Sequence, residues 1–95
     1  MSRKVMPLDR QVGMFEAHWE DAYDDLPRIL EEYRATIHRM GRERGVDGFA
    51  IYGDSAVRMP PPERLRNVLE EFADALWYAT QGDLPAPQGR PAVRS

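Results

Sequence analysis

The sequence predicts an all-α protein, a small domain of three helices. Apolar residues recur at steps of three and four in three separate stretches, which is the spacing that lines one side of a helix. The only run of strand formers is "FAIY" at 49–52. A single strand without a partner cannot form a sheet, because its backbone groups would lack a ladder. The expected architecture is therefore a two-helix hairpin, an ordered loop and a third helix.

The first helix is predicted over residues 8–24, directly after Pro7. Its apolar stripe continues a little beyond that range and contains Val12, Phe15, Trp19, Tyr23 and Leu26. Asp9 suits the start of this helix, because a short side-chain oxygen can accept hydrogen bonds from the unpaired N–H groups of a first turn.

The second helix is predicted over residues 27–40. Pro27 suits its first position, since the N–H that proline lacks would have no partner there. The apolar face consists of Ile29, Leu30, Tyr33, Ile37 and Met40. Gly41 and Gly45 supply the left-handed residue with which many helices end. The first two helices are therefore expected to form an antiparallel hairpin.

Residues 46–62, "VDGFAIYGDSAVRMPPP", are predicted to form an ordered loop, because two glycines and three prolines interrupt the helical pattern. Within it, "YGDS" has the composition of a turn in which Gly53 adopts a positive φ. The third helix is predicted over residues 62–80. Its apolar face consists of Leu65, Val68, Leu69, Phe72, Leu76 and Ala79. Residues 1–83 are expected to form one domain, and residues 84–95 a flexible, proline-rich tail.

Size and composition narrow the classes of function. A chain of 95 residues without cysteine buries only about 60–65% of its unfolded surface and has no disulfides to compensate, which predicts a homo-oligomer, a helical bundle formed by self-association. The net charge of −3 disfavours binding to nucleic acid. No apolar run approaches the ~20 residues that span a bilayer, so we expect a cytoplasmic protein without a membrane partner.

The segment "EEFADALWYA" at 70–79 combines carboxylates with two large aromatic side chains. On a helical wheel, Glu70, Asp74, Trp77 and Tyr78 lie away from the apolar stripe and Glu71 lies at its flank. We therefore expect this face to be covered by a second subunit or by a ligand. Carboxylates three and four residues apart can converge on one ion, and their hard oxygens suit Mg²⁺ or Mn²⁺. Alternatively, these acids are solvated beside helix-surface arginines such as Arg64 and Arg66.

"EEFADALWY" resembles the third-helix signature of the MazG-like nucleotide pyrophosphohydrolases, a Glu-x-x-Asp followed by an apolar, often Leu-Trp-Tyr, continuation. Glu71 and Asp74 fall on the acidic positions of that pattern. "YGDSAVRM" at 52–59 is similar to a segment of phage-associated MazG-like relatives. The resemblance implies an all-α oligomer that uses Mg²⁺ to cut a nucleoside triphosphate between its α and β phosphates.

The sequence departs from that family in one respect. MazG-like proteins carry a Glu-x-x-Glu on the preceding helix, whereas Glu31 and Glu32 are adjacent here. The nearest substitutes are Glu32, taken as the third metal ligand, and Asp25, seven residues before it; Asp21 and Asp24 are weaker alternatives.

Two functions follow from these observations. In the first, the protein is a metal-dependent nucleotide pyrophosphohydrolase or a nucleotide-binding relative. Glu71 and Asp74 then bind the metal and Glu70 assists or orients water. Tyr52 or Trp77 stacks on a base, and Arg58 or Arg64 contacts phosphate. In the second, the chain is a non-enzymatic helical protein, of a kind found in phages, which dimerises or binds a host protein through the Trp77 and Tyr78 face.

Overall fold

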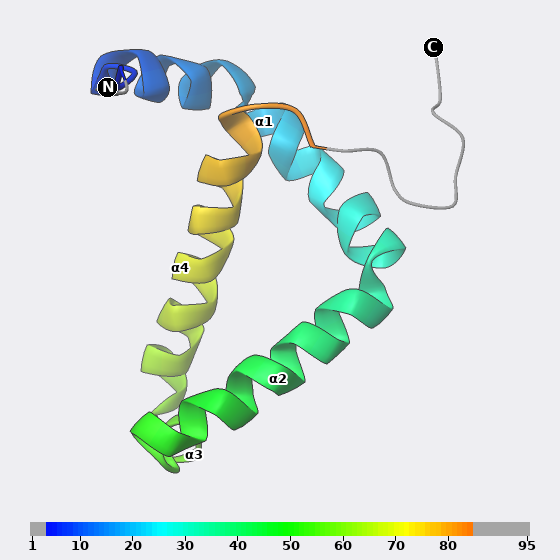
Figure 1. Cartoon of the computed structure of the whole chain (residues 1–95), viewed down its shortest axis with the longest axis vertical. Coiled ribbons are helices and arrows are strands. Elements are labelled where there is room, and N and C mark those ends of the chain that lie inside the picture. The colour runs from blue at the N-terminus through cyan, green and yellow to red at the C-terminus, as the bar shows by residue number, and fades with distance from the viewer. Residues whose placement is uncertain (1–3, 85–95) are drawn as a thin grey trace.

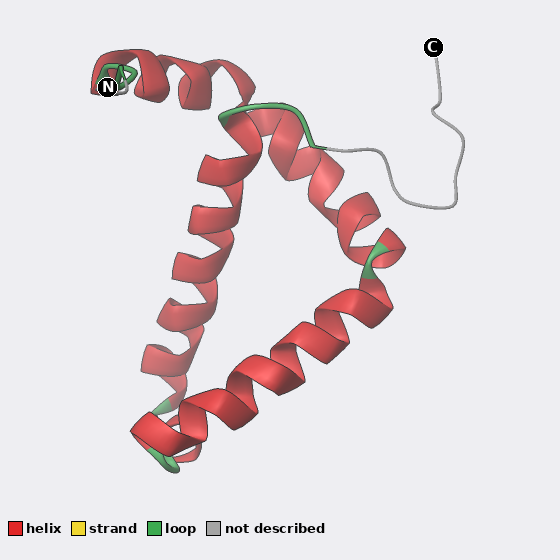
Figure 2. Cartoon of the chain, viewed as in Figure 1, coloured by secondary structure: helices red, strands yellow, loops and turns green. Residues whose placement is uncertain are grey.

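The structure is a computed structural model that describes residues 4–84. These residues are 84% helical and contain no strand, which confirms the all-α prediction. The described residues form four helices rather than three (Figure 2). They are α1 (Leu8–Glu32), α2 (Arg34–Tyr52), α3 (Ser55–Arg58) and α4 (Pro61–Thr80). None of the four is long and apolar enough to cross a membrane, within the part of the chain that the structure describes.

α1 is one continuous helix, so the predicted hairpin of helices 8–24 and 27–40 is wrong. Pro27 lies inside α1 instead of starting a new helix. A proline inside a helix removes a single backbone donor and crowds the preceding turn. Breaking the helix there would leave four N–H and four C=O groups without intrahelical partners. Continuation through Pro27 therefore sacrifices fewer backbone hydrogen bonds than a break.

α2 begins directly after Tyr33 and passes through Gly41 and Gly45, where the sequence predicted a stop. Neither glycine has a positive φ; among the described residues only Gly53 does, at 58°. The left-handed residue therefore comes after Tyr52, which confirms the turn predicted at Gly53. The predicted loop 46–62 is wrong over its first part, because "FAIY" forms the last turn of α2, and residues 55–58 form α3.

α4 occupies the predicted third-helix range almost to the residue. Pro61 and Pro62 lie in its first turn, where the missing N–H groups would have had no partner in any case. Of the proline-rich tail predicted over 84–95, residues 85–95 lie outside the described part of the chain.

The three long helices run along the sides of an open triangle (Figure 1). α4 meets α1 at one corner, α1 continues into α2 at the second, and α3 joins α2 to α4 at the third. The Cα radius of gyration is 16.9 Å, against about 12 Å for a compact domain of this length. Among residues 4–84 no apolar side chain is fully buried. The described residues therefore form helices without a closed hydrophobic core.

The corner between α1 and α4 is the best-packed part of the described chain. The rings of Phe15 and Trp77 lie 5.7 Å apart, centroid to centroid, and are tilted by 30°. Thr80 is only 3% exposed, and its hydroxyl donates a hydrogen bond to the Trp77 carbonyl at 2.9 Å. The side-chain amide of Gln81 donates a hydrogen bond to the backbone carbonyl of Gln11 at 3.0 Å, which ties the end of α4 to the start of α1.

Candidate functional site

The candidate carboxylates lie on one exposed side of α4. Glu70 is engaged in a local ion pair, because its Oε1 lies 3.1 Å from Nε of Arg66 one turn earlier. Glu71 and Asp74 are exposed, and within residues 4–84 neither side chain takes part in a hydrogen bond or ion pair. They are three residues apart, about 4.5 Å along the helix axis. Glu71 and Asp74 therefore present adjacent carboxylates that are available to a cation.

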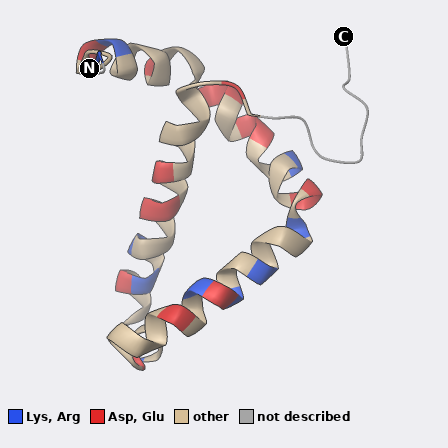
Figure 3. Cartoon of the chain, viewed as in Figure 1, with Lys and Arg blue, Asp and Glu red and all other residues tan. Residues whose placement is uncertain are grey.

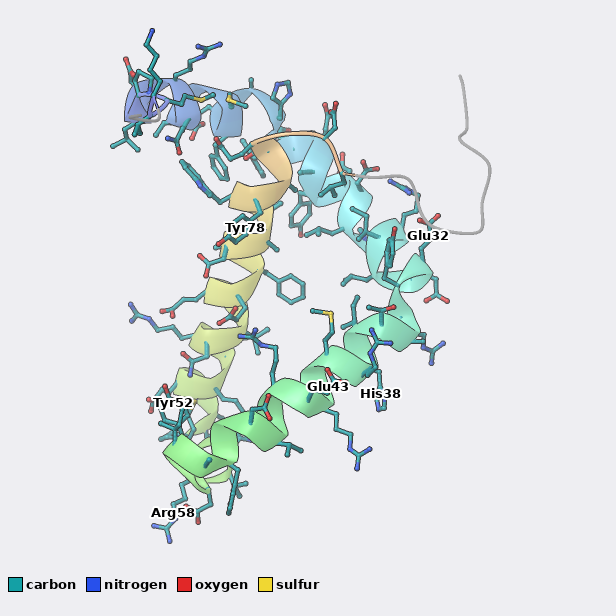
Figure 4. All side chains as sticks on the ribbon, in the orientation of Figure 1. Glu32, His38, Glu43, Tyr52, Arg58 and Tyr78 are labelled. Atoms are coloured by element: carbon teal, nitrogen blue, oxygen red, sulfur yellow. The ribbon has the colours of Figure 1, made fainter. Side chains whose placement is uncertain are left out.

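The third predicted metal ligand, Glu32, lies elsewhere. It is the last residue of α1, and its Oε2 lies 3.3 Å from Nη1 of Arg28. Figure 4 places it well apart from Tyr78 on α4. The substitute Asp25 contacts the same guanidinium at 3.7 Å. Within the described residues, no three acidic or histidine side chains converge closely enough to hold a metal ion. Of the predicted metal ligands, only Glu71 and Asp74 on α4 lie close together in the described part of the chain.

The helical wheel placed Trp77 on the outward face of α4, and this prediction is wrong. It is half-buried and packs on Phe15 of α1. Tyr78, in contrast, is 76% exposed, as expected. Trp77 is covered because α1 crosses α4 at this point and brings the Phe15 ring against the indole. Of the predicted aromatic surface, only Tyr78 remains exposed.

The remaining candidate residues lie at the other end of α4. Tyr52 ends α2 and is exposed, and Arg58 ends α3, with Nε 3.0 Å from Oδ2 of Asp54. Arg64 and Trp77 are 13 residues apart on one helix, a rise of about 20 Å. Figure 4 shows Tyr52 and Arg58 near one corner of the triangle and Tyr78 near another. The structure therefore divides the predicted substrate-binding residues into two groups.

Arg64 has a structural role in addition to any contact with phosphate. Its Nη2 donates to three carbonyl oxygens at the end of α3, those of Ala56, Val57 and Met59, at 3.3, 3.1 and 2.9 Å. Because α3 ends here, no following helical turn supplies N–H donors to these carbonyl oxygens. The Arg64 guanidinium supplies the missing donors instead. Arg64 thereby fixes the direction in which α4 leaves α3.

We expect Arg64→Ala to lower the free energy of unfolding by about 1–2 kcal/mol, because it removes a charged donor from three carbonyls. Arg66→Ala is the matched control. It removes only an exposed ion pair on the same helix, worth less than about 0.5 kcal/mol. Urea denaturation followed by far-UV circular dichroism measures both variants. Equal losses in the two would contradict the role assigned to Arg64.

Sequence reasoning missed Phe15 as the partner of Trp77. Phe15 is one of the half-buried residues that line one side of α1. They include Gln11, Phe15, Ala22, Leu26 and Ile29. Gln11 and Ala22 are not strongly apolar, so a search for large hydrophobic residues selected Trp19 and Tyr23 instead. Both of these side chains are exposed in the subunit.

Searches of protein-family models, of curated proteins and of solved structures find no match to this chain. The chemistry of the site is therefore argued from its side chains. Glu71 and Asp74 offer four oxygen acceptors, a donor set that fits a hard divalent cation whose other ligands are water and phosphate.

Proposed function

We propose that the protein binds a nucleoside triphosphate together with Mg²⁺ or Mn²⁺ and hydrolyses it between the α and β phosphates, as MazG-like pyrophosphohydrolases do. The observation that supports this most directly is the pair Glu71 and Asp74, adjacent on an exposed helix face and without an arginine partner in residues 4–84. We place this activity in the cytoplasm, where nucleoside triphosphates are abundant.

Two carboxylates are sufficient for one such cation, because Mg²⁺ in proteins is commonly held by one or two carboxylates plus substrate phosphates and water. The bound cation would neutralise phosphate charge and lower the pKa of a water ligand. Glu70, one residue before Glu71, would accept the proton from that water. Its ion pair with Arg66 is exposed and worth at most about 0.5 kcal/mol, so it does not prevent that role.

The test is isothermal titration with Mn²⁺ and then with a panel of nucleotides, combined with an assay for released pyrophosphate. We expect Asp74→Asn to weaken metal binding and to reduce hydrolysis by about 100-fold or more, because the cation then loses one of its two carboxylates. Glu63→Gln is the matched control on the same helix, about 12 Å away from Glu71, and should retain both properties.

Absence of heat with every nucleotide and of any released pyrophosphate from the unsubstituted protein would overturn this proposal. A non-enzymatic interaction protein would then be the second candidate. It is favoured by the exposed Tyr78 and by the absence of a buried apolar side chain among residues 4–84. In that function, which includes binding to a host protein, Asp74→Asn should leave partner binding intact.

A further inference from the structure

The charges of the described chain are unevenly distributed among its helices. α1 contains eight carboxylates and two arginines, and α4 contains four carboxylates and two arginines. α2 has the opposite balance, with four arginines and two carboxylates. Figure 3 shows the arginines recurring along α2 and the acidic residues along α1. The net charge of −3, which disfavoured binding to nucleic acid, therefore does not describe the surface of α2.

One side of α2 is cationic along its first half. Arg34, His38 and Arg42 follow one another at steps of four residues and lie within an arc of about 80° around the helix. All three are exposed. Within residues 4–84 none of their side chains takes part in a hydrogen bond or ion pair. Figure 4 shows His38 on the side of α2 that faces away from α4. This side is therefore open to a ligand from solution.

The same side of α2 ends in an exposed aromatic ring. Phe49 lies two turns after Arg42, inside the same arc, and is 68% exposed. Between them is Gly45, where an added Cβ atom would meet nothing within 4 Å. A glycine at this position lets a ligand approach the helix backbone closely. The cationic stripe, defined as Arg34, His38, Arg42, Gly45 and Phe49, thus combines positive charge with a flat apolar ring.

This combination fits a strand of unpaired nucleic acid. Proteins bind such strands with positive side chains that follow the phosphate backbone and with aromatic rings on which the bases stack. Arg34 and Arg42 are about 12 Å apart along the helix, so they can contact different phosphates. The Phe49 ring lies about 10 Å beyond Arg42 and is accessible to a base.

A paired duplex or a membrane surface fits the cationic stripe less well. The bases of a duplex are stacked on one another, so Phe49 would find no free base. A helix that lies on a membrane needs a continuous apolar side. On α2 that side is interrupted by Arg44, which stands between Met40 and Ile51. A single strand is the ligand that uses both the charge and the ring.

We propose that the cationic stripe of α2 binds single-stranded DNA or RNA, with Arg34 and Arg42 on phosphates and Phe49 stacked on a base. At about 0.1 M salt, charges more than about 10 Å apart are largely screened. The charge of α2 itself, rather than the net charge of the chain, therefore governs this contact. The contact involves neither Glu71 nor Asp74 and needs no metal ion.

Fluorescence anisotropy tests the proposal with labelled oligothymidylate and oligouridylate of about 12 nucleotides, in buffer with a chelator. We expect dissociation constants of about 1–100 µM. The logarithm of the affinity should fall with that of the salt concentration with a slope of about −1.4, since each phosphate contacted by a protein on a single strand contributes about −0.7.

Two neighbouring arginines provide the variant and its matched control. Arg42→Gln should halve the salt slope and weaken binding about fivefold at about 0.1 M salt, because one phosphate contact is lost. Arg44 lies two residues further on and on the opposite side of α2. Arg44→Gln should therefore bind within about twofold of the unsubstituted chain. Far-UV circular dichroism verifies that both variants keep their helices, and glutamine favours a helix about as well as arginine does.

Substitutions of Phe49 separate stacking from charge. Phe49→Ala should weaken binding at least about fivefold and leave the salt slope unchanged, because a stacking contact is lost and no phosphate contact is. Phe49→Tyr keeps an aromatic ring and should retain the affinity of the unsubstituted chain.

Three outcomes would overturn the proposal. Neither strand binds the unsubstituted chain, or Arg42→Gln and Arg44→Gln weaken binding equally, or a duplex of the same length binds at least as tightly as a single strand. The second outcome would mean that any positive charge on α2 attracts the strand, and the third that base stacking has no role. Because the chelator excludes the metal site, failure here does not bear on nucleotide hydrolysis.

Discussion

Replacing Trp77 with alanine should detach α4 from α1 and lower the free energy of unfolding by about 2–4 kcal/mol. The Trp77 ring supplies the aromatic contact with Phe15. Its removal leaves a void beside Thr80, the most deeply buried residue described. Urea denaturation measures the change, with the fluorescence of Trp19 as the remaining indole reporter.

The neighbouring aromatic residue provides the control. Tyr78 is on the same helix turn but is 76% exposed, so Tyr78→Ala should change the free energy of unfolding by less than about 0.5 kcal/mol. If the two alanine variants lose the same stability, the contact between Phe15 and Trp77 does not stabilise the subunit. A larger loss for Tyr78→Ala would mean that its face is covered in the assembled protein.

The sequence predicted α4 well because all of its local signals agree. Prolines stand in its first turn, where they are tolerated, and a regular apolar stripe runs to Ala79. At Pro27, Gly41 and Gly45 a local signal competes with continuation of the helix. A proline or glycine inside a helix costs about 1–3 kcal/mol, whereas an additional helix end leaves several backbone groups unpaired. Rules based on single residues therefore placed breaks where the chain continues.

The candidate site was predictable in part for a similar reason. Glu70 and Asp74 lie away from the apolar stripe and Glu71 at its flank on any helix with this sequence, so their exposure follows from periodicity alone. Periodicity places Trp77 on the same side as Glu70. The burial of Trp77 depends on where α1 crosses, which involves residues more than 60 positions away. The positions of Glu32 and Arg64 depend likewise on the angles between helices, which periodicity does not contain.

Alanine substitutions at two glycines test the helix propensity of α2. Cβ atoms at Gly41 and at Gly45 would both meet nothing within 4 Å, so either alanine should stabilise α2 by about 1 kcal/mol. Urea denaturation followed by far-UV circular dichroism measures both variants. A loss of stability in either variant would contradict the open space at that glycine, because an added methyl group is destabilising only where it meets a neighbour.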